Sequence, residues 1–211
     1  MATTAADYQW IEDYSDLAEA YCVTLVRGVT VQEFLTAMKA EPEGDLTGYA
    51  ALDRRAGEVY DEHSGDKYLI GATTIPGDHG EWVLGLEANG FLGTLPHLLE
   101  PLSSGTRLVS HFCNVNAVDR FQWYEDGTLC TYFEPLFPTQ RDGSTPDELL
   151  EAMAEVGFDL EEDDEEFIDS PTTEAAFALA DRLTGVHLTP EVLDNATFAT
   201  GLTPRTTTRT S

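Results

Sequence analysis

The sequence predicts an α+β fold: a mostly antiparallel sheet of about five strands, with helices packed on one face and a helical C-terminal part. Three observations predict this fold. Short runs of β-branched and aromatic residues fill the middle of the chain, an Asp-Gly hairpin signal joins two of them, and amphipathic runs with helix-start signals fill the last third. With 211 residues, of which 42% are hydrophobic, the chain is long and apolar enough for one folded domain.

The first forty residues are predicted to form a helix, an apolar run and a second helix. The apolar run, residues 21–26, fits either the end of the first helix or a first strand. Thr30 and Glu33 have the spacing of a capping box, in which each side chain accepts a hydrogen bond from the backbone N–H of the other residue. This spacing predicts a helix over residues 31–39.

Residues 41–66 are expected to form a loop with one helical turn near residues 50–55, because they contain four glycines and many charges. The chain after this loop is rich in strand-forming residues. Asp126 and Gly127 suit the positive φ angles of a type I′ hairpin turn, and the leucines around Pro96 predict a short helix or 3₁₀ segment that starts there. The predicted strands are residues 67–75, 82–86, 107–112, 121–124 and 128–133.

The last third is predicted to be helical. One helix begins near Pro146 and ends at Gly157, a second begins at Pro171 and ends at Gly185, and a third, shorter one begins at Pro190. Proline suits the first turn of a helix, because the N–H that it lacks would have no partner there, and glycine suits the residue after the last turn.

These elements divide the chain into four expected segments. The α+β core takes most of the sequence, and an acidic linker connects it to helices that pack back onto it. The final residues are rich in threonine and poor in apolar side chains, so they are expected to be disordered. The segments are residues 1–158, 159–169, 170–200 and 201–211.

The charge of the chain excludes one class of function. The 39 acidic and 11 basic residues give a formal net charge of −28 at pH 7. Nucleic-acid phosphates and anionic membrane surfaces repel such a chain, so neither is expected as a direct partner. The longest uncharged stretches, residues 69–77 and 88–99, are too short and too interrupted to span a bilayer.

The N-terminus and the cysteines indicate a cytoplasmic location. Residues 1–14 contain three acids, no basic residue and no apolar core, which is the opposite of a signal peptide. The cysteines, Cys22, Cys113 and Cys130, lie in apolar runs without CxxC spacing. This pattern favours reduced, buried thiols over a disulfide framework or a zinc site.

Several segments, in this order along the chain, resemble an uncharacterised actinobacterial family of unknown function. The likeness covers most of residues 5–200, and it implies no activity, cofactor or site residue. The segments that carry the resemblance are residues 20–28, the strand around Trp82, and residues 121–135, 141–143, 156–158 and 183–191.

The densest chemical feature is an acidic run in which eight of eleven residues, 159–169, are acids. A calcium loop would need alternating ligands, a glycine at the sixth position and a glutamate at the twelfth, and this run has no glycine. Two interpretations remain open: a solvated linker, or part of a surface for a basic partner.

Aromatic residues next to a hairpin could anchor a partner. Trp123 and Tyr124 are adjacent in a predicted strand, so they point to opposite faces, and one of them is either exposed or covered by a helix. An exposed aromatic beside Glu125 and Asp126 would suit protein contact. The candidate partner-binding residues are Asp159, Glu161, Glu162, Asp163, Asp164, Glu165, Glu166, Trp123 and Tyr124.

Two further groups of residues carry side chains that could do chemistry. His111 and Cys113 share one face of a predicted strand, but no glycine-rich elbow or orienting signature accompanies them, so they are interpreted as core neighbours. Loop residues could supply a metal site only if folding brings them together. These residues are His63, Asp66, His79 and Glu81.

The sequence therefore favours a non-enzymatic cytoplasmic protein-interaction module, of the immunity, antitoxin or regulatory-adaptor kind. Its acidic surface would bind a basic protein partner, and it needs no cofactor, metal or catalytic residue. Two alternatives stay open. One is a DNA mimic, whose carboxylates imitate the phosphate spacing of a duplex. The other is a metal-dependent hydrolase that uses loop residues between His63 and Glu81.

Overall fold

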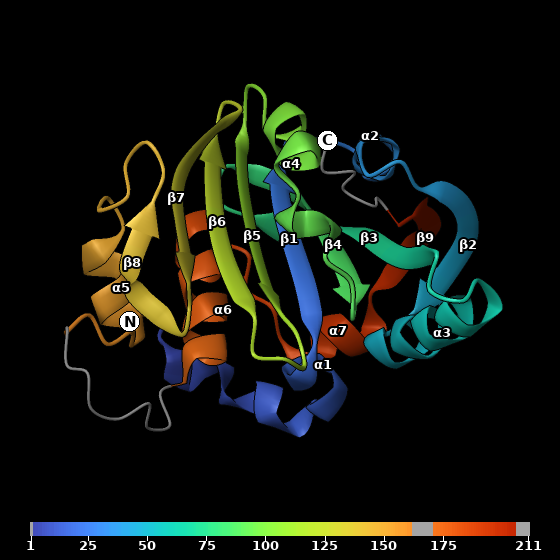
Figure 1. Ribbon diagram of the computed structural model, residues 1–211, viewed down its shortest axis with the longest axis horizontal. Helices are drawn as coiled ribbons and strands as arrows, with labels where there is room; N and C mark the ends of the chain where they lie inside the picture. The colour runs from blue at the N-terminus through green and yellow to red at the C-terminus, as the bar shows by residue number, and fades with distance from the viewer. Residues whose placement is uncertain (1, 162–170, 206–211) are drawn as a thin grey trace.

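The computed structural model describes residues 2–161 and 171–205, which form an α+β fold around one antiparallel sheet (Figure 1). The strands are β1 (Tyr21–Arg27), β2 (Glu41–Thr47), β3 (Lys67–Gly77), β4 (Gly80–Ala88), β5 (Arg107–Cys113), β6 (Asp119–Glu125), β7 (Thr128–Glu134), β8 (Phe137–Asp142) and β9 (Thr197–Pro204). The helices are η1 (Ala5–Asp13), α1 (Ser15–Glu19), α2 (Val31–Ala37), α3 (Tyr49–Glu62), η2 (Leu92–Thr94), α4 (Pro96–Leu102), α5 (Leu150–Val156), α6 (Thr172–Thr184) and α7 (Pro190–Asn195).

The sheet has nine strands within the described residues, in the order β2-β9-β3-β4-β1-β5-β6-β7-β8. The prediction of about five strands is therefore wrong. The five predicted strands are present as β3 to β7, and residues 21–26 lie in a further strand, β1. Sequence reasoning missed β2, β8 and β9, which lie at or beside the edges of the sheet.

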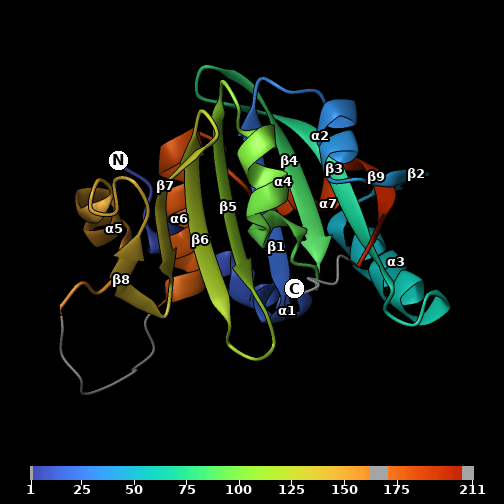
Figure 2. The ribbon, with the colours of Figure 1, turned by 45° about the horizontal axis from the view of Figure 1, so that its top comes forward.

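Helices cover both faces of the sheet, so the prediction of helices on one face is also wrong. Figures 1 and 2 show α6 on one side of the strands and α4 on the other. Alternate residues of β1 point to the two sides: Val23 and Leu25 pack in the core with α3, α5, α6 and η1, whereas Val26 packs in a second core with α2, α4 and η2. The helices α2 and α4 of this second layer were predicted as helices, but their position on the other face depends on tertiary packing and was not predicted.

The missed strands lack the usual strand signals. Every residue of β2 is exposed or half-buried at the edge of the sheet, so its sequence Glu-Pro-Glu-Gly-Asp-Leu-Thr shows no apolar alternation. Proline in β8 likewise suits an edge strand. Strand β9 has a neighbouring strand on each side but is rich in small residues: a Cβ at Gly201 would lie 2.8 Å from the Cβ of Ala40. Close packing selects small side chains there, and these weaken the strand pattern.

Several local predictions are confirmed. Thr30 accepts a hydrogen bond from Glu33 N at 3.2 Å while Glu33 accepts one from Thr30 N at 2.8 Å, which is the predicted capping box at the start of α2. Both residues of the Asp126-Gly127 turn have positive φ angles, as a type I′ turn requires. Gly185 ends α6 in the left-handed conformation, with φ of +67°.

The predictions for two segments need correction. Residues 41–66 are a strand and a 14-residue helix rather than a loop. Residues 201–204, assigned to a disordered tail, form the end of β9, because its backbone pairs with both β2 and β3. The predictions for residues 162–170 and 206–211 lie outside the described residues.

The described helices also bear on membrane insertion. The longest of them, α3, has 14 residues and carries several charges. Within residues 2–161 and 171–205, no helix has both the length and the apolar character needed to cross a membrane. The three cysteines are free thiols.

Candidate functional site

The acidic run is described only at its start. Asp159 and Glu161 are exposed, and Glu161 N donates a hydrogen bond to Asp159 Oδ1 at 3.0 Å. The other acids of the run that were singled out as partner-binding candidates lie outside the described residues. They are Glu162, Asp163, Asp164, Glu165 and Glu166.

Trp123 and Tyr124 point to opposite faces of the sheet, as predicted, but both are buried. Trp123 is 5% exposed, donates from Nε1 to Glu125 Oε1 at 2.9 Å and lies under the Arg107 guanidinium. Tyr124 is fully buried in the core with α2, α4 and η2. Neither ring is an exposed aromatic anchor, because both faces of the sheet are covered.

His111 is a core residue. Its Nδ1 lies 3.2 Å from the hydroxyl of Tyr21, and its ring packs edge-on against Phe177 with 4.4 Å between centroids. Burial lowers the pKa of His111 to about 3, so the imidazole is neutral. Burial raises the pKa of the nearby Cys113 thiol. Both shifts oppose an ion pair of thiolate and imidazolium, the form in which such a pair would attack a substrate.

The loop residues considered for a metal site lie at two ends of one strand. His63 and Asp66 precede β3, whereas His79 and Glu81 follow it. Eleven residues of strand span roughly 36 Å at about 3.3 Å per residue, so these side chains do not form one site. In the described part of the chain, no group of three or more His, Cys, Asp or Glu side chains could hold a metal ion.

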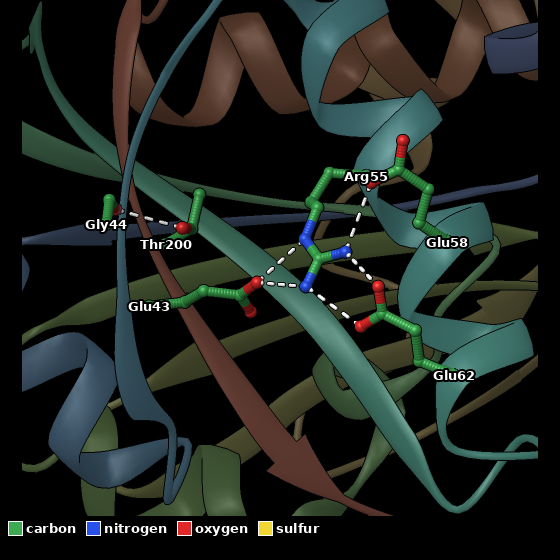
Figure 3. Close-up of polar contacts among 6 residues, drawn as sticks. All are labelled: Glu43, Gly44, Arg55, Glu58, Glu62 and Thr200. Carbon is green, nitrogen blue, oxygen red and sulfur yellow. Dashed lines mark hydrogen bonds and ion pairs between the residues drawn. The ribbon is translucent and has the colours of Figure 1, made fainter.

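The acidic surface is best defined around β2 and α3. Arg55 of α3 donates from Nε to Glu43 of β2 at 2.7 Å and from Nη1 to Glu58 and Glu62 at 3.1 and 2.9 Å (Figure 3). The guanidinium thus sits among three carboxylates and lowers the pKa of Glu62. The single positive charge of Arg55 therefore neutralises only one of the three surrounding negative charges.

Other basic side chains are likewise held by acids of the same chain. Five of the eleven basic residues form ion pairs with described carboxylates, so their charge is already partly neutralised. The pairs beyond the Arg55 cluster are Lys67–Glu41, Arg107–Glu125, Arg141–Asp147 and Arg182–Glu155. The surface therefore keeps a large excess of acid. We call Glu41, Glu43 and Asp45, all exposed on edge strand β2, the acidic edge.

A hollow of about 330 Å³ lies between the β3–β4 turn, the α6–α7 connection and α7. Asp78, in the turn, is held from both sides: its N–H donates to Thr184 O at 2.7 Å, and its carbonyl accepts from Trp82 Nε1 at 2.9 Å. A Cβ at Gly185 would lie 2.5 Å from Asp78 Oδ1, so only glycine leaves room for this carboxylate. The residues that line the hollow are Ile75, Pro76, Gly77, Asp78, Gly185, His187 and Val192.

The imidazole in this hollow is oriented by a buried carboxylate. Asp181 Oδ2 lies 2.8 Å from His187 Nδ1 and accepts a hydrogen bond from the Tyr8 hydroxyl at 3.0 Å. Asp181 is 7% exposed, whereas His187 is exposed. Burial and the neighbouring Asp181 raise the pKa of Tyr8, so its hydroxyl stays protonated and remains a donor. Because a carboxylate oxygen accepts, His187 Nδ1 is the donor in this hydrogen bond.

The hollow was not predicted from the sequence, because the residues that form it are distant from one another along the chain. Tyr8, Asp78 and His187 stand in three different segments, and no spacing motif links them. The only local signals were the Gly185 helix end and the Thr-Pro start of α7, which bracket His187. A paired histidine and aspartate six residues apart is too common a pattern to mark a site.

The C-terminal end of β2 lies beside the end of α7, because Gly48 N donates to Ala196 O at 3.0 Å. Helix α7 also contributes Val192 to the hollow.

Comparison with known proteins gives a family but no activity. A family model described as a family of unknown function (DUF6461) matches residues 1–208. This match confirms the prediction of an uncharacterised family. No match was found among curated proteins, and none was found among solved structures.

Proposed function

The chain belongs to this family of unknown function, and we propose that it is a non-enzymatic interaction module that binds a basic protein partner through its acidic surface. The finer parts of the proposal are a cytoplasmic location, an actinobacterial family, and a role as an immunity protein, antitoxin or regulatory adaptor. They come from the charge, the pattern of the cysteines and the resemblance described above.

One observation carries the proposal. The chain has 39 acids and 11 bases, and five of those bases are bound to acids of the same chain. A net charge of about 2 to 8 in magnitude is ample for the solubility of a small domain. The excess beyond that value attracts a basic partner and speeds its association.

The acidic edge is where we place the contact. Its acids alternate along an edge strand whose outer side has no neighbouring strand among the described residues. Charge on such a strand discourages pairing with neutral strands and favours a basic partner.

The test is capture of partners from the native cell on immobilised protein at low salt, with identification of what is bound. We expect one or a few basic proteins, released when the salt is raised to about 0.5 M because screening weakens the attraction. Purified partner should then bind the wild type at least tenfold more tightly than Glu41→Gln/Asp45→Asn. Glu148→Gln/Glu151→Gln, which removes two exposed acids elsewhere, is the matched control.

Two outcomes would overturn the proposal. If the captured proteins are not basic, or if salt does not change their binding, the interaction is not electrostatic. If the two double variants weaken partner binding equally, the contact does not lie at the acidic edge. A partner that binds nucleic acid and is released by duplex DNA would identify DNA mimicry instead.

A further inference from the structure

We propose that the hollow lined by Asp78 and His187 receives an arginine side chain. The inference rests on the proposed function and names the group of the basic partner that is recognised. Asp78, one of the residues that line the hollow, supplies a carboxylate. A guanidinium carries five N–H donors in a planar fork and no acceptor, so it complements this carboxylate.

The walls of the hollow fit the rest of an arginine side chain. Ile75, Pro76 and Val192 are apolar and line the same space, which suits the three methylene groups of arginine. No lysine or arginine is among the lining residues. The volume of about 330 Å³ accommodates one long side chain.

The turn that carries the Asp78 carboxylate is fixed before the ligand arrives. Two hydrogen bonds to its backbone hold this turn, and the Tyr8–Asp181 pair holds the imidazole of His187. Groups that are already fixed lose little conformational entropy on binding, which favours affinity.

A second hollow in the chain provides the comparison. It has a volume of about 260 Å³ and is lined by two carboxylates, those of Glu134 and Asp142, but also by Arg141. The Arg141 guanidinium already contacts Asp147 and the Pro138 carbonyl. A cation entering this second hollow meets a resident positive charge, so Asp142 serves as the matched control for Asp78.

The test is a titration of the full chain, labelled with ¹⁵N-histidine, with Nα-acetyl-arginine methylamide. We expect a saturable shift of the His187 ring nitrogens, with a dissociation constant in the millimolar range because a single side chain offers few contacts. Asp78→Asn should weaken binding about tenfold, the usual loss for a charge-assisted hydrogen bond. Asp142→Asn should leave it unchanged.

Three results would overturn the assignment. They are equal binding of the neutral citrulline analogue, equal or tighter binding of the lysine analogue, and equal affinity of Asp78→Asn and wild type. An unchanged tryptophan indole spectrum in Asp78→Asn verifies that the turn is intact, since Trp82 donates to the Asp78 carbonyl.

The result also separates this inference from the proposed function. If a basic partner binds wild type and Asp78→Asn equally, the interaction module stands and the arginine hollow does not. If the arginine analogue binds as expected but no basic protein is captured, the hollow stands and the interaction module does not.

Discussion

At the scale of single residues, the most consequential side chain outside the hollow is a buried glutamate. Glu87 is 1% exposed and accepts hydrogen bonds from the backbone N–H groups of Leu92 and Gly93 at 3.1 and 3.2 Å. It therefore fastens η2 to the sheet. Burial raises the pKa of Glu87 to about 7, although these hydrogen bonds favour the ionised form and oppose the rise.

Glu87 makes the stability of the protein depend on pH. A carboxyl whose pKa is higher in the folded than in the unfolded state contributes stability below the unfolded pKa of about 4.5, and this contribution is lost as the pH rises through 7. Glu87→Gln abolishes the titration. From pH 4 to pH 8, the free energy of unfolding of Glu87→Gln should therefore rise relative to wild type by about 3 kcal/mol.

Urea unfolding at pH 4, 6 and 8 measures this difference. Glu12→Gln, a change at an exposed carboxyl, is the control for the substitution itself. A difference between Glu87→Gln and wild type that stays constant with pH would contradict the prediction.

At the scale of elements, Arg55 joins α3 to edge strand β2. Its guanidinium contacts Glu43 of β2 and two glutamates of α3, so it links the helix to the strand (Figure 3). Without it, three carboxylates face one another. The link matters because β2 has no buried side chain of its own among its seven residues.

Arg55→Met should lower the free energy of unfolding by about 1 kcal/mol, a modest value because the network is partly exposed. The loss should shrink in about 0.5 M salt, since screening weakens the repulsion among the remaining carboxylates. Thermal unfolding in low and high salt measures both effects. Arg54→Met, at the exposed neighbouring position, should have a smaller effect, and equal losses for the two variants would exclude the link.

At the scale of the whole molecule, the sheet is completed by its ninth strand. Strand β9 lies between β2 and β3 and pairs with both, and Phe198 within it is fully buried. Without β9, strand β2 has no partner among the described strands, and β3 becomes an edge.

A chain that ends at Ala196 should therefore lose most of its stability, whereas one that ends at Arg205 should keep it. Phe198→Ala in the full chain should alone cost about 3 to 5 kcal/mol, because it leaves a cavity in the core. Circular dichroism during thermal unfolding compares the three chains with wild type. Equal midpoints for the chain ending at Ala196 and wild type would show that β9 is dispensable.

Sequence reasoning predicted those features whose cause is local. The capping box of Thr30 and Glu33, the Asp126-Gly127 turn and the Gly185 helix end each depend on a few adjacent residues. Strands β3 to β7 were predicted because their runs of β-branched and aromatic residues are bounded by turn residues. Strand β2 was missed because its sequence has no apolar alternation and its partner strand β9 is distant in sequence.

In the candidate site, too, only the features with a local or compositional cause were predicted. The acidic character of the surface is a property of composition and was predicted, but its arrangement on β2 was not. The hollow depends on Asp181 orienting His187 and on Gly185 yielding space to Asp78, and both depend on tertiary packing. Trp123 and Tyr124 were expected to leave one ring exposed or covered by a helix, and both are buried, Trp123 in the core with α3, α5, α6 and η1 and Tyr124 in the core with α2, α4 and η2.

The placement of β9 also sets an order of events during synthesis. Strand β2 leaves the ribosome 150 residues before β9, the only strand it pairs with in the described sheet. At roughly 5 to 20 residues per second, β2 waits about 8 to 30 s for its partner. Its acids and its proline keep a newly made, unpaired strand from adhering to other nascent chains. The acidic edge thus protects the chain before it has folded.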